Sequence, residues 1–378
     1  TGCVKYDGLQ QNYGRSDLLP LWVADMDFAT APFVTDAIRK RCENEVLGYT
    51  GKPDSYYNAI INWVKQRYDL IVTKEVINFV PGIVPGIGMA MNCFTQKGDK
   101  VMIQPPVYHP FAWVTTRNER TLVINPLRWE NGMYRMDLDA FREQIKGCKL
   151  FILCNPHNPG GVVWTEAELR AIADICYDEK VLVFSDEIHA DLTLPPHTHR
   201  PFATVSEKAR MNSVTFMSPS KAFNMPGLSA SHALIFNEDL RKRFRIYMDA
   251  GELDMGHVFA FLSVEAAYSH GTEWLDQCLA YIQGNIDFVD EFLKKHAPKI
   301  KAIRPEASYL VWLDCRELEL SQKDLNEFFV DKAHLALNDG EMFGKEGIGF
   351  MRLNVASPRC IIEKAMKQLA DAYQLYIK

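Results

Sequence analysis

Seven short apolar runs recur along the first two thirds of the chain, and several of them are separated by segments with helical periodicity. Each run is rich in Val, Ile, Leu and Phe, which is typical of strands that are buried on both faces. Alternation of such strands with helices predicts an α/β fold with a mostly parallel seven-stranded sheet that helices cover on both sides. The predicted strands span residues 77–80, 101–104, 122–125, 150–154, 181–185, 214–217 and 233–236.

The sequence between the fourth and fifth of these runs predicts the start of a helix. Thr165 and Glu168 have the spacing of a capping box, in which each side chain bonds the other residue's backbone N–H. Leu169, Ile172 and Cys176 then fall on one helical stripe. We therefore expect a helix here that packs its apolar stripe on the sheet.

The pattern changes near residue 273. Apolar residues recur at helical spacing over residues 274–298, which predicts a long helix leaving the sheet. Strand-like runs at 309–313 and 349–353 then alternate with amphipathic segments, as in a small α+β domain. A chain of 378 residues exceeds what one core usually supports. We expect an N-terminal arm that packs with the small domain (1–30), a large domain (31–272), and a linking helix with a small C-terminal domain (273–378).

Lys221 follows the predicted strand 214–217 and the hydroxyl residues Ser218 and Ser220. A lysine amine at a strand end can form a Schiff base with a cofactor aldehyde, while neighbouring hydroxyls bind the cofactor's phosphate. The same Ser-x-x-Lys spacing also occurs in serine acyl-enzymes, where Ser218 would be the nucleophile. A surface lysine without a chemical role is the third interpretation.

Asp186 directly follows the predicted strand 181–185. A carboxylate at this position can be a metal ligand, a helix cap or a general base. In pyridoxal phosphate enzymes it instead keeps the pyridine nitrogen protonated, so that the ring accepts electrons from a substrate carbanion.

Two Pro- and Gly-rich turns carry further candidates. The run 150–154 breaks into a turn that contains Asn158, which is either a plain tight turn or a donor to a cofactor oxygen. The other turn holds Gly82 and precedes the helix-like residues 87–94. Free N–H groups at a helix start bind phosphate, and glycine allows close approach of the backbone. Asn158, Asp186 and Lys221 all follow strands, which places them along the carboxyl edge of the sheet, where ligands bind.

Taken together, these segments resemble the fold-type I pyridoxal-phosphate enzymes of the aminotransferase class I/II family, over nearly the whole chain. The resemblance implies the PLP-dependent transferase fold and pyridoxal 5′-phosphate (PLP) as cofactor. Residues 19–28, 186–191 and 221–228 are more specifically similar to the cystathionine β-lyase-like C–S lyase branch.

The resemblance implies a role for each candidate. Lys221 would bind the cofactor covalently and carry protons, Asp186 would pair with the pyridine nitrogen, and Tyr108 would stack on the ring, so these three form the catalytic set. Asn158 would contact the ring oxygen, and Arg352 would bind the substrate α-carboxylate through its guanidinium fork.

The phosphate of PLP would be held by small residues and by a residue from a second subunit. In the family, a tyrosine matching Tyr49 crosses the dimer interface to the neighbouring phosphate, so the resemblance implies a homodimer with shared active sites. The remaining phosphate-binding residues would be Gly82, Ile83, Val84, Ser218 and Ser220.

Two departures from the aspartate aminotransferase pattern favour the lyase branch. His189 stands where that pattern has a tyrosine, and Ser229 stands where it has an arginine. We therefore expect β-elimination from cystathionine or a cysteine S-conjugate, an amino acid or thioether substrate, to yield thiol, pyruvate and ammonia. The alternatives are a PLP-dependent aminotransferase and a PLP-holding regulatory protein that acts through protein contacts.

Composition narrows the range of partners. The formal net charge is −6 and no basic stripe is present, which argues against nucleic acid as a partner. No apolar run approaches membrane-spanning length, so we expect no membrane partner. Nine dispersed cysteines indicate reduced core thiols in a cytoplasmic protein. His197 and His199 are expected in a surface loop, and we expect no metal site.

Overall fold

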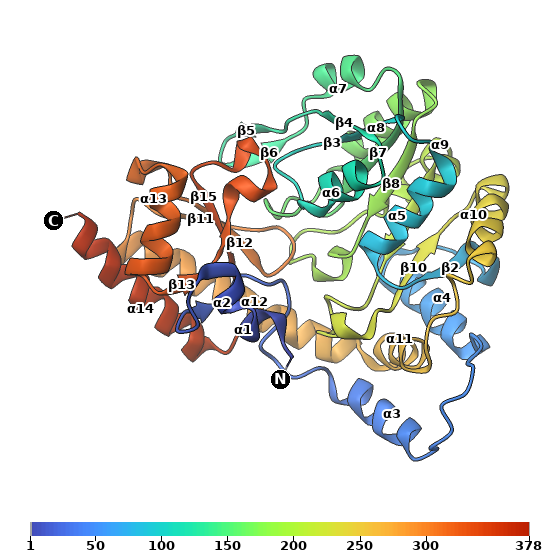
Figure 1. The fold of residues 1–378 in the computed structure, drawn as a ribbon, viewed down its shortest axis with the longest axis horizontal. Coiled ribbons are helices and arrows are strands. Elements are labelled where there is room, and N and C mark those ends of the chain that lie inside the picture. The colour runs from blue at the N-terminus through green and yellow to red at the C-terminus, as the bar shows by residue number, and fades with distance from the viewer. Residues whose placement is uncertain (1, 378) are drawn as a thin grey trace.

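The computed structural model describes residues 2–377. A seven-stranded sheet occupies one end of the molecule and a four-stranded sheet the other, as Figure 1 shows. The large sheet has the order β2-β10-β9-β8-β7-β3-β4, in which β10 is antiparallel to both neighbours and the other pairs are parallel. Its strands are β2 (Ile77–Val80), β3 (Lys100–Ile103), β4 (Thr121–Ile124), β7 (Cys148–Cys154), β8 (Leu182–Asp186), β9 (Ser213–Met217) and β10 (Ser231–Leu234).

The mostly parallel seven-stranded sheet predicted from the apolar runs is confirmed. Each predicted run overlaps an observed strand, and the boundaries differ by at most two residues. The runs are reliable because strands buried on both faces need apolar residues at nearly every position.

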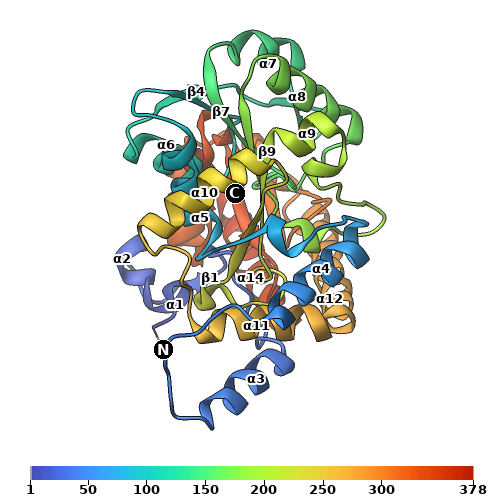
Figure 2. The same cartoon turned by 90° about the vertical axis from the view of Figure 1, so that its right-hand side faces the viewer.

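Helices cover both faces of this sheet, and strand β7 shows why. Leu150 and Ile152 point to the face covered by α5 (Ile83–Phe94), whereas Phe151 and Leu153 point to the face covered by α8 (Glu166–Asp178). Figure 2 shows α5 and α10 on one side and α8 and α9 on the other. The remaining helices around the large sheet are α3 (Pro32–Cys42), α4 (Asp54–Tyr68), α6 (Pro110–Arg117), α7 (Leu138–Gln144), α9 (Glu207–Met211), α10 (Glu238–Ala250) and α11 (Val258–His270).

The predicted capping box is confirmed at the start of α8. The Thr165 hydroxyl accepts from the Glu168 N–H at 3.2 Å, and the Glu168 carboxylate accepts from the Thr165 N–H at 2.8 Å. The reciprocal bonds fix where this helix leaves the preceding turn.

The small sheet is antiparallel, with the order β11-β12-β15-β14. The N-terminal arm lies against this part of the molecule, because β1 (Leu19–Pro20) pairs in parallel with β13 (Leu335–Ala336). The predicted long helix is present as α12 (Thr272–His296), while the domain limits at 30/31 and 272/273 stay a prediction. The other elements here are α1 (Val4–Asp7), α2 (Leu9–Tyr13), β11 (Lys301–Ile303), β12 (Leu310–Asp314), α13 (Gln322–Glu327), β14 (Asn338–Asp339), β15 (Phe350–Asn354) and α14 (Arg359–Tyr376).

One expectation about histidine is wrong. His199 is buried rather than in a surface loop, and its Nε2 lies 2.8 Å from the carboxylate of Glu187, which is also buried. Glu187 needs this partner because its carboxylate is fully buried, and it also accepts bonds from Ser185 Oγ and the Phe202 N–H. His197, by contrast, is exposed.

The cysteines divide between core and surface. Five are buried, but Cys42 and Cys360 are exposed, so the expectation of core thiols holds only for part of the set. The buried cysteines are Cys148, Cys154, Cys176, Cys278 and Cys315.

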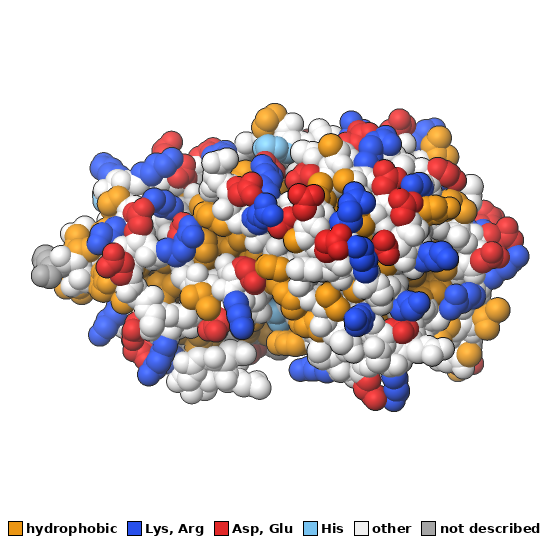
Figure 3. Space-filling model, turned by 90° about the horizontal axis from the view of Figure 1, so that it is seen from above, with side chains coloured by type: hydrophobic (Ala, Val, Ile, Leu, Met, Phe, Trp, Pro, Cys, Tyr) orange, Lys and Arg blue, Asp and Glu red, His pale blue; other side chains and the backbone are white. Residues whose placement is uncertain are grey.

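The surface has mixed charge. On the face shown in Figure 3, Lys and Arg side chains alternate with Asp and Glu rather than gathering in one basic patch. Among residues 2–377, none of the helices combines the length and the apolar composition that a membrane span requires.

Candidate active site

The carboxyl ends of three neighbouring strands, β7, β8 and β9, converge on one cavity of about 210 Å³. In the sheet, Cys154 at the end of β7 lies opposite Asp186 at the end of β8. The turns that follow therefore bring together side chains that are far apart in the sequence. The polar side chains lining the cavity are Tyr108, Asn158, Asp186, His189, Ser220 and Lys221.

Lys221 and Asp186 both line the cavity, yet no ion pair joins them among the described residues. The Lys221 ammonium donates to the carbonyl oxygen of Ala24 at 2.5 Å. Asp186 Oδ1 accepts from the backbone N–H of Ile188 at 3.0 Å, which leaves Oδ2 for a ligand. The two charged groups thus border a space that a flat ring can enter.

Burial shifts the pKa values of both groups toward neutrality. It raises the pKa of Asp186 to about 7, although the nearby Lys221 cation opposes this change. Burial lowers the pKa of Lys221 to about 8, and the Arg352 cation lowers it further while Asp25 and Asp186 act against it. A lysine with a pKa near 8 supplies a substantial fraction of free amine at neutral pH, which a nucleophile or base requires.

Arg352 is linked to the cavity by a hydrogen bond to Asn158, which lines it. Its Nη1 donates to Asn158 Oδ1 at 2.9 Å. Because a guanidinium can only donate, Asn158 must present its oxygen to Arg352, so its amide Nδ2 points elsewhere. Arg352 is buried, and its Nε has no partner within the described chain. The arginine therefore retains a donor for an anionic ligand.

The N-terminus of α5 borders the same cavity. Ile83 and Val84 line it, and no side chain caps the helix at Gly82. The first N–H groups of a helix have no acceptor within the helix, so those of Ile83 and Val84 are available to a phosphate. The helix begins at Ile83, earlier than the apolar pattern from residue 87 suggested, because Pro85 fits the first turn of a helix.

The two serines before Lys221 differ in position. Ser220 lines the cavity, whereas Ser218 does not. Ser218 Oγ donates to the Ala230 carbonyl at 2.7 Å and accepts from the Ser220 N–H at 3.1 Å. Ser218 thus holds Ser220 in place. Ser229, the residue at the position of the family arginine, is exposed and has a left-handed backbone conformation with φ 47°.

The two candidate tyrosines are far from equivalent in this chain. Tyr108 lines the cavity, and burial raises the pKa of its hydroxyl above the ordinary value. Tyr49 lies outside the cavity, in a segment without helix or strand, and is 98% exposed. Of the other sequence-predicted site residues, Gly82, Ser218 and Arg352 do not line the cavity but adjoin or bond residues that do, and the rest line it.

Three site features were not among the site residues predicted from the sequence. His189 lines the cavity, burial lowers its pKa to about 3, and its Nδ1 has no partner in the described chain. The Ala24 carbonyl bonds Lys221, and Asn338 bonds Arg352. The missing tyrosine at position 189 was a usable signal for the histidine. The Ala24–Lys221 contact joins the N-terminal arm to the turn after β9, and the Asn338–Arg352 contact joins two neighbouring strands of the small sheet. Neither contact has a local pattern in the sequence.

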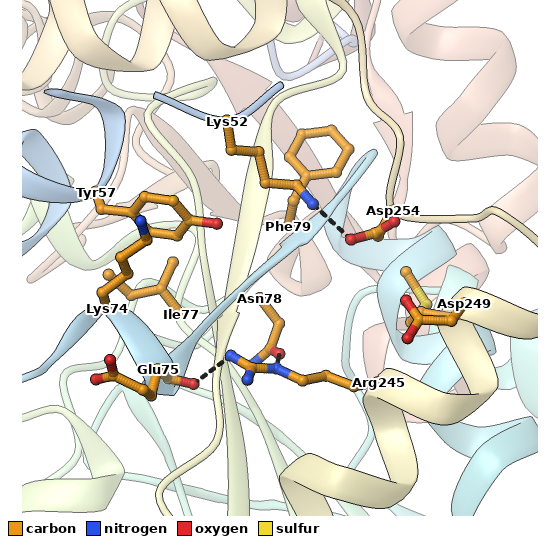
Figure 4. Close-up of a pocket in the computed structure, with 11 residues that line it drawn as sticks. Lys52, Tyr57, Lys74, Glu75, Ile77, Asn78, Phe79, Arg245, Asp249 and Asp254 are labelled. Atoms are coloured by element: carbon orange, nitrogen blue, oxygen red, sulfur yellow. Dashed lines mark hydrogen bonds and ion pairs between the residues drawn. The ribbon is translucent and has the colours of Figure 1, made fainter. Parts of the chain in front are cut away.

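A larger cavity of about 360 Å³ lies at the amino end of β2, beside α10 (Figure 4). Its cations already have partners: Lys52 bonds Asp254, and Arg245 bonds Asn78 Oδ1 and the Glu75 carbonyl. Because its charges are paired and it is far from the carboxyl edge of β7–β9, we do not assign it the chemistry.

Comparisons with known proteins agree with this geometry. The family model "Aminotransferase class I and II" matches residues 16–369. Cystathionine beta-lyase PatB of Bacillus subtilis (strain 168) is 38% identical over 374 residues, which cover 98% of this chain and 97% of that protein.

Two solved structures are close in both fold and sequence. Cystalysin from Treponema denticola, which contains a PLP cofactor, has a TM-score of 0.96 and 34% identity over 100% of this chain and 96% of its own. A PLP-bound protein from Clostridium difficile 630, described as a candidate aminotransferase, has a TM-score of 0.96 and 41% identity, covering 98% and 96%. The site geometry and these matches lead to one conclusion: the chain belongs to the aminotransferase class I and II family.

Proposed function

We propose that this protein is a PLP-dependent C–S β-lyase that cleaves cystathionine or cysteine S-conjugates to thiol, pyruvate and ammonia. The observation that carries the proposal is that Lys221 and Asp186 line the same cavity without forming an ion pair with each other. The similarity to cystathionine beta-lyase PatB over nearly the full length of both chains supports the choice of reaction.

The residues around the cavity fit PLP. The N–H groups of Ile83 and Val84, together with Ser220, would hold its phosphate, and Asp186 would accept from the pyridine N–H. Asn158 has its oxygen turned to Arg352, which leaves its amide donor for the ring oxygen. Tyr108, with its flat aromatic side chain, would cover one ring face.

The cofactor supplies an aldehyde for covalent attachment and a ring that accepts electrons. Lys221 would provide the amine for attachment, and its Nζ, once free, would accept the Cα proton of the substrate. Asp186 would be the anionic acceptor for the pyridine N–H, because a positive charge on the ring nitrogen would lower the pKa of this carboxyl from its raised value. Arg352 fixes the α-carboxylate, so that the Cα–H bond faces Lys221.

Two positions favour elimination over amino transfer. His189 replaces the tyrosine hydroxyl expected beside the ring oxygen in the aspartate aminotransferase pattern, and it is a neutral imidazole because burial lowers its pKa to about 3. Ser229 replaces the expected arginine and is exposed rather than part of the cavity lining. The site therefore offers fewer cations to PLP than that pattern does.

The test uses the purified protein loaded with PLP. L-Cystathionine is added, and thiol and pyruvate are followed with and without a 2-keto acid. We expect both products without the keto acid, whereas turnover that requires the keto acid would assign the protein to the aminotransferases. Borohydride treatment followed by peptide mapping should place the pyridoxyl group on Lys221; an adduct elsewhere would refute the assignment of the site.

We expect the protein in the cytoplasm. We further propose a homodimer in which Tyr49 reaches the phosphate site of the partner subunit. Val46, Leu47 and Tyr49 are 70%, 64% and 98% exposed, which is unusual for neighbouring large apolar side chains and favours burial against a second copy. Mixing inactive Lys221→Ala with weakened Tyr49→Ala should restore activity through hybrid dimers. A monomer in sedimentation, or no recovery on mixing, would contradict the shared site.

A further inference from the structure

Arg352 is a buried cation without a carboxylate partner among residues 2–377. Its guanidinium is held by neutral acceptors: Nη1 donates to Asn158 Oδ1 at 2.9 Å, and Nη2 donates to Asn338 Oδ1 at 2.5 Å and to the Trp22 carbonyl at 3.3 Å. The ring of Phe343 lies 4.8 Å from the guanidinium carbon. A buried charge held in this way keeps its attraction for an anion that arrives from outside.

Asn338 lies beside Arg352 on the neighbouring strand of the small sheet. The two residues are partners in the antiparallel register of β14 and β15, and Asn338 is only 7% exposed. Since the guanidinium only donates, the amide oxygen of Asn338 must face it. The hydrogen bond between the two side chains and the backbone pairing of β14 with β15 hold the Arg352 guanidinium on a sheet rather than on a loop.

The end of β14 is itself anchored. Asp339, the next residue, accepts from Gln322 Nε2 at 2.7 Å and from Asn326 Nδ2 at 2.5 Å, and both donors come from α13. Because β14 has two residues only, these bonds fix the strand more than its own ladder does. Asn338 is therefore held firmly enough to hold Arg352 in turn.

The neutrality of this partner matters chemically. An aspartate at position 338 would make the same contact but would satisfy the positive charge of Arg352 within the protein. A substrate carboxylate would then have to compete with it. The neutral amide of Asn338 holds the guanidinium of Arg352 without neutralising its positive charge.

From these contacts we propose that Asn338 is a positioning residue that presents Arg352, still carrying an unneutralised charge, to the α-carboxylate of the substrate. This rests on the proposed function only in so far as Arg352 binds that carboxylate. It adds the device that keeps the arginine both fixed and available.

Binding to the PLP-loaded protein tests the proposal without depending on which reaction follows. L-Alanine carries the carboxylate and ethylamine lacks it, and binding of either amine to the cofactor changes its visible absorption. We expect Asn338→Ala to weaken L-alanine binding about tenfold, the loss typical of one hydrogen bond to a charged group. Asn338→Asp should weaken it more, and neither variant should change the affinity for ethylamine.

A double-mutant cycle with Arg352→Ala separates positioning from a general structural effect. If Asn338 acts through Arg352, Asn338→Ala should cost nothing further once the arginine is gone; an equal loss in both backgrounds would overturn the proposal. Asn326→Ala is the matched comparison: it removes one of the two anchors of Asp339 but leaves the Gln322 bond and the Asn338–Arg352 bond, so we expect a clearly smaller loss. A loss for Asn326→Ala as large as that for Asn338→Ala would also overturn the proposal.

If the wild-type protein bound L-alanine but released no thiol from cystathionine, the proposed lyase function would fail while the role of Asn338 stood. With cystathionine turnover as a second readout, the Asn338 variants should raise KM with little change in kcat. A fall in kcat at constant KM would count against positioning of the carboxylate.

Discussion

Arg352 and Asn158 are 194 residues apart in the sequence, yet Nη1 of the arginine donates to Oδ1 of the asparagine at 2.9 Å. This bond ties the group proposed to bind the substrate carboxylate to the group that would face the cofactor ring. It also decides the orientation of the amide, because a guanidinium accepts no hydrogen bonds. In the proposed site, substrate binding at Arg352 and the electronic state of the ring would therefore be linked through one side chain.

The first prediction concerns this link. Asn158→Asp should lower the affinity for carboxylate substrates by at least about tenfold, because the new carboxylate pairs with Arg352. It should also change the pH dependence of the visible absorption of bound PLP, since the amide donor is lost. Titration of the absorbance with and without L-alanine measures both effects. Unchanged absorption together with weaker binding would mean that Asn158 serves Arg352 alone.

The second prediction concerns the reactivity of Lys221. Only the neutral amine attacks an aldehyde, and burial lowers the pKa of Lys221 from 10.5 to about 8. The rate of covalent attachment of PLP to the cofactor-free protein should therefore rise with pH and level off above about 8. Borohydride trapping at a series of pH values, with peptide mapping, gives this rate for residue 221. Exposed Lys323 is the internal comparison, and a rate at Lys221 that follows its profile would contradict the shifted pKa.

The third prediction concerns stability without the cofactor. Burial raises the pKa of Asp186 from 3.8 to about 7, so the folded protein holds a proton there that the unfolded chain has lost. The contribution of this protonated group to folding is complete below about pH 4 and disappears as the pH rises through about 7.

Asp186→Asn should accordingly stabilise the cofactor-free protein above pH 7, by an amount of the order of 4 kcal/mol at most. The difference from wild type should shrink as the pH falls toward about 5. Urea unfolding at several pH values measures it. With PLP bound the sign should reverse, because the mutant lacks the carboxylate that pairs with the pyridine nitrogen; equal PLP stabilisation of both proteins would argue against that pairing.

The fourth prediction concerns the packing of α5, the helix proposed to bind the phosphate, against the sheet. A Cβ at Gly86 would lie 2.9 Å from Val80 Cγ2 and 3.1 Å from Phe216 Cε1, so α5 approaches the sheet only because this residue has no side chain. Gly86→Ala should destabilise the protein by about 1–3 kcal/mol and weaken PLP binding, because the helix start moves. Gly284→Ala in α12 is the control, since its nearest neighbour would be 3.5 Å away. We expect that variant to be neutral or slightly stabilised.

Much of this architecture could be predicted because its signals are local. Runs such as 150–154 need no knowledge of their neighbours, since a strand buried on both faces is apolar throughout. The capping box at Thr165 is a pattern of four consecutive residues. The grouping of Asn158, Asp186 and Lys221 also followed, because parallel strands place their carboxyl ends at one edge.

The failures have a common cause. His199 was expected at the surface, but its partner Glu187 is buried behind the site, and burial of one member of a pair cannot be read from the other. Asn338 gave no signal because β14 has only two residues, too few for any periodicity. Tyr49 is a different case: it was singled out by family resemblance alone, and its role across a dimer interface stays a prediction because one chain does not test it.

The sequence by itself determined the order of strands and helices along the chain and pointed to the groups proposed to carry the chemistry, since both are recorded in neighbouring residues. The tertiary structure alone decided which neutral oxygens hold Arg352, which way the Asn158 amide turns and how far burial shifts Lys221 and Asp186. These properties depend on distances and desolvation between segments that meet only when the chain has folded, and no local pattern encodes them.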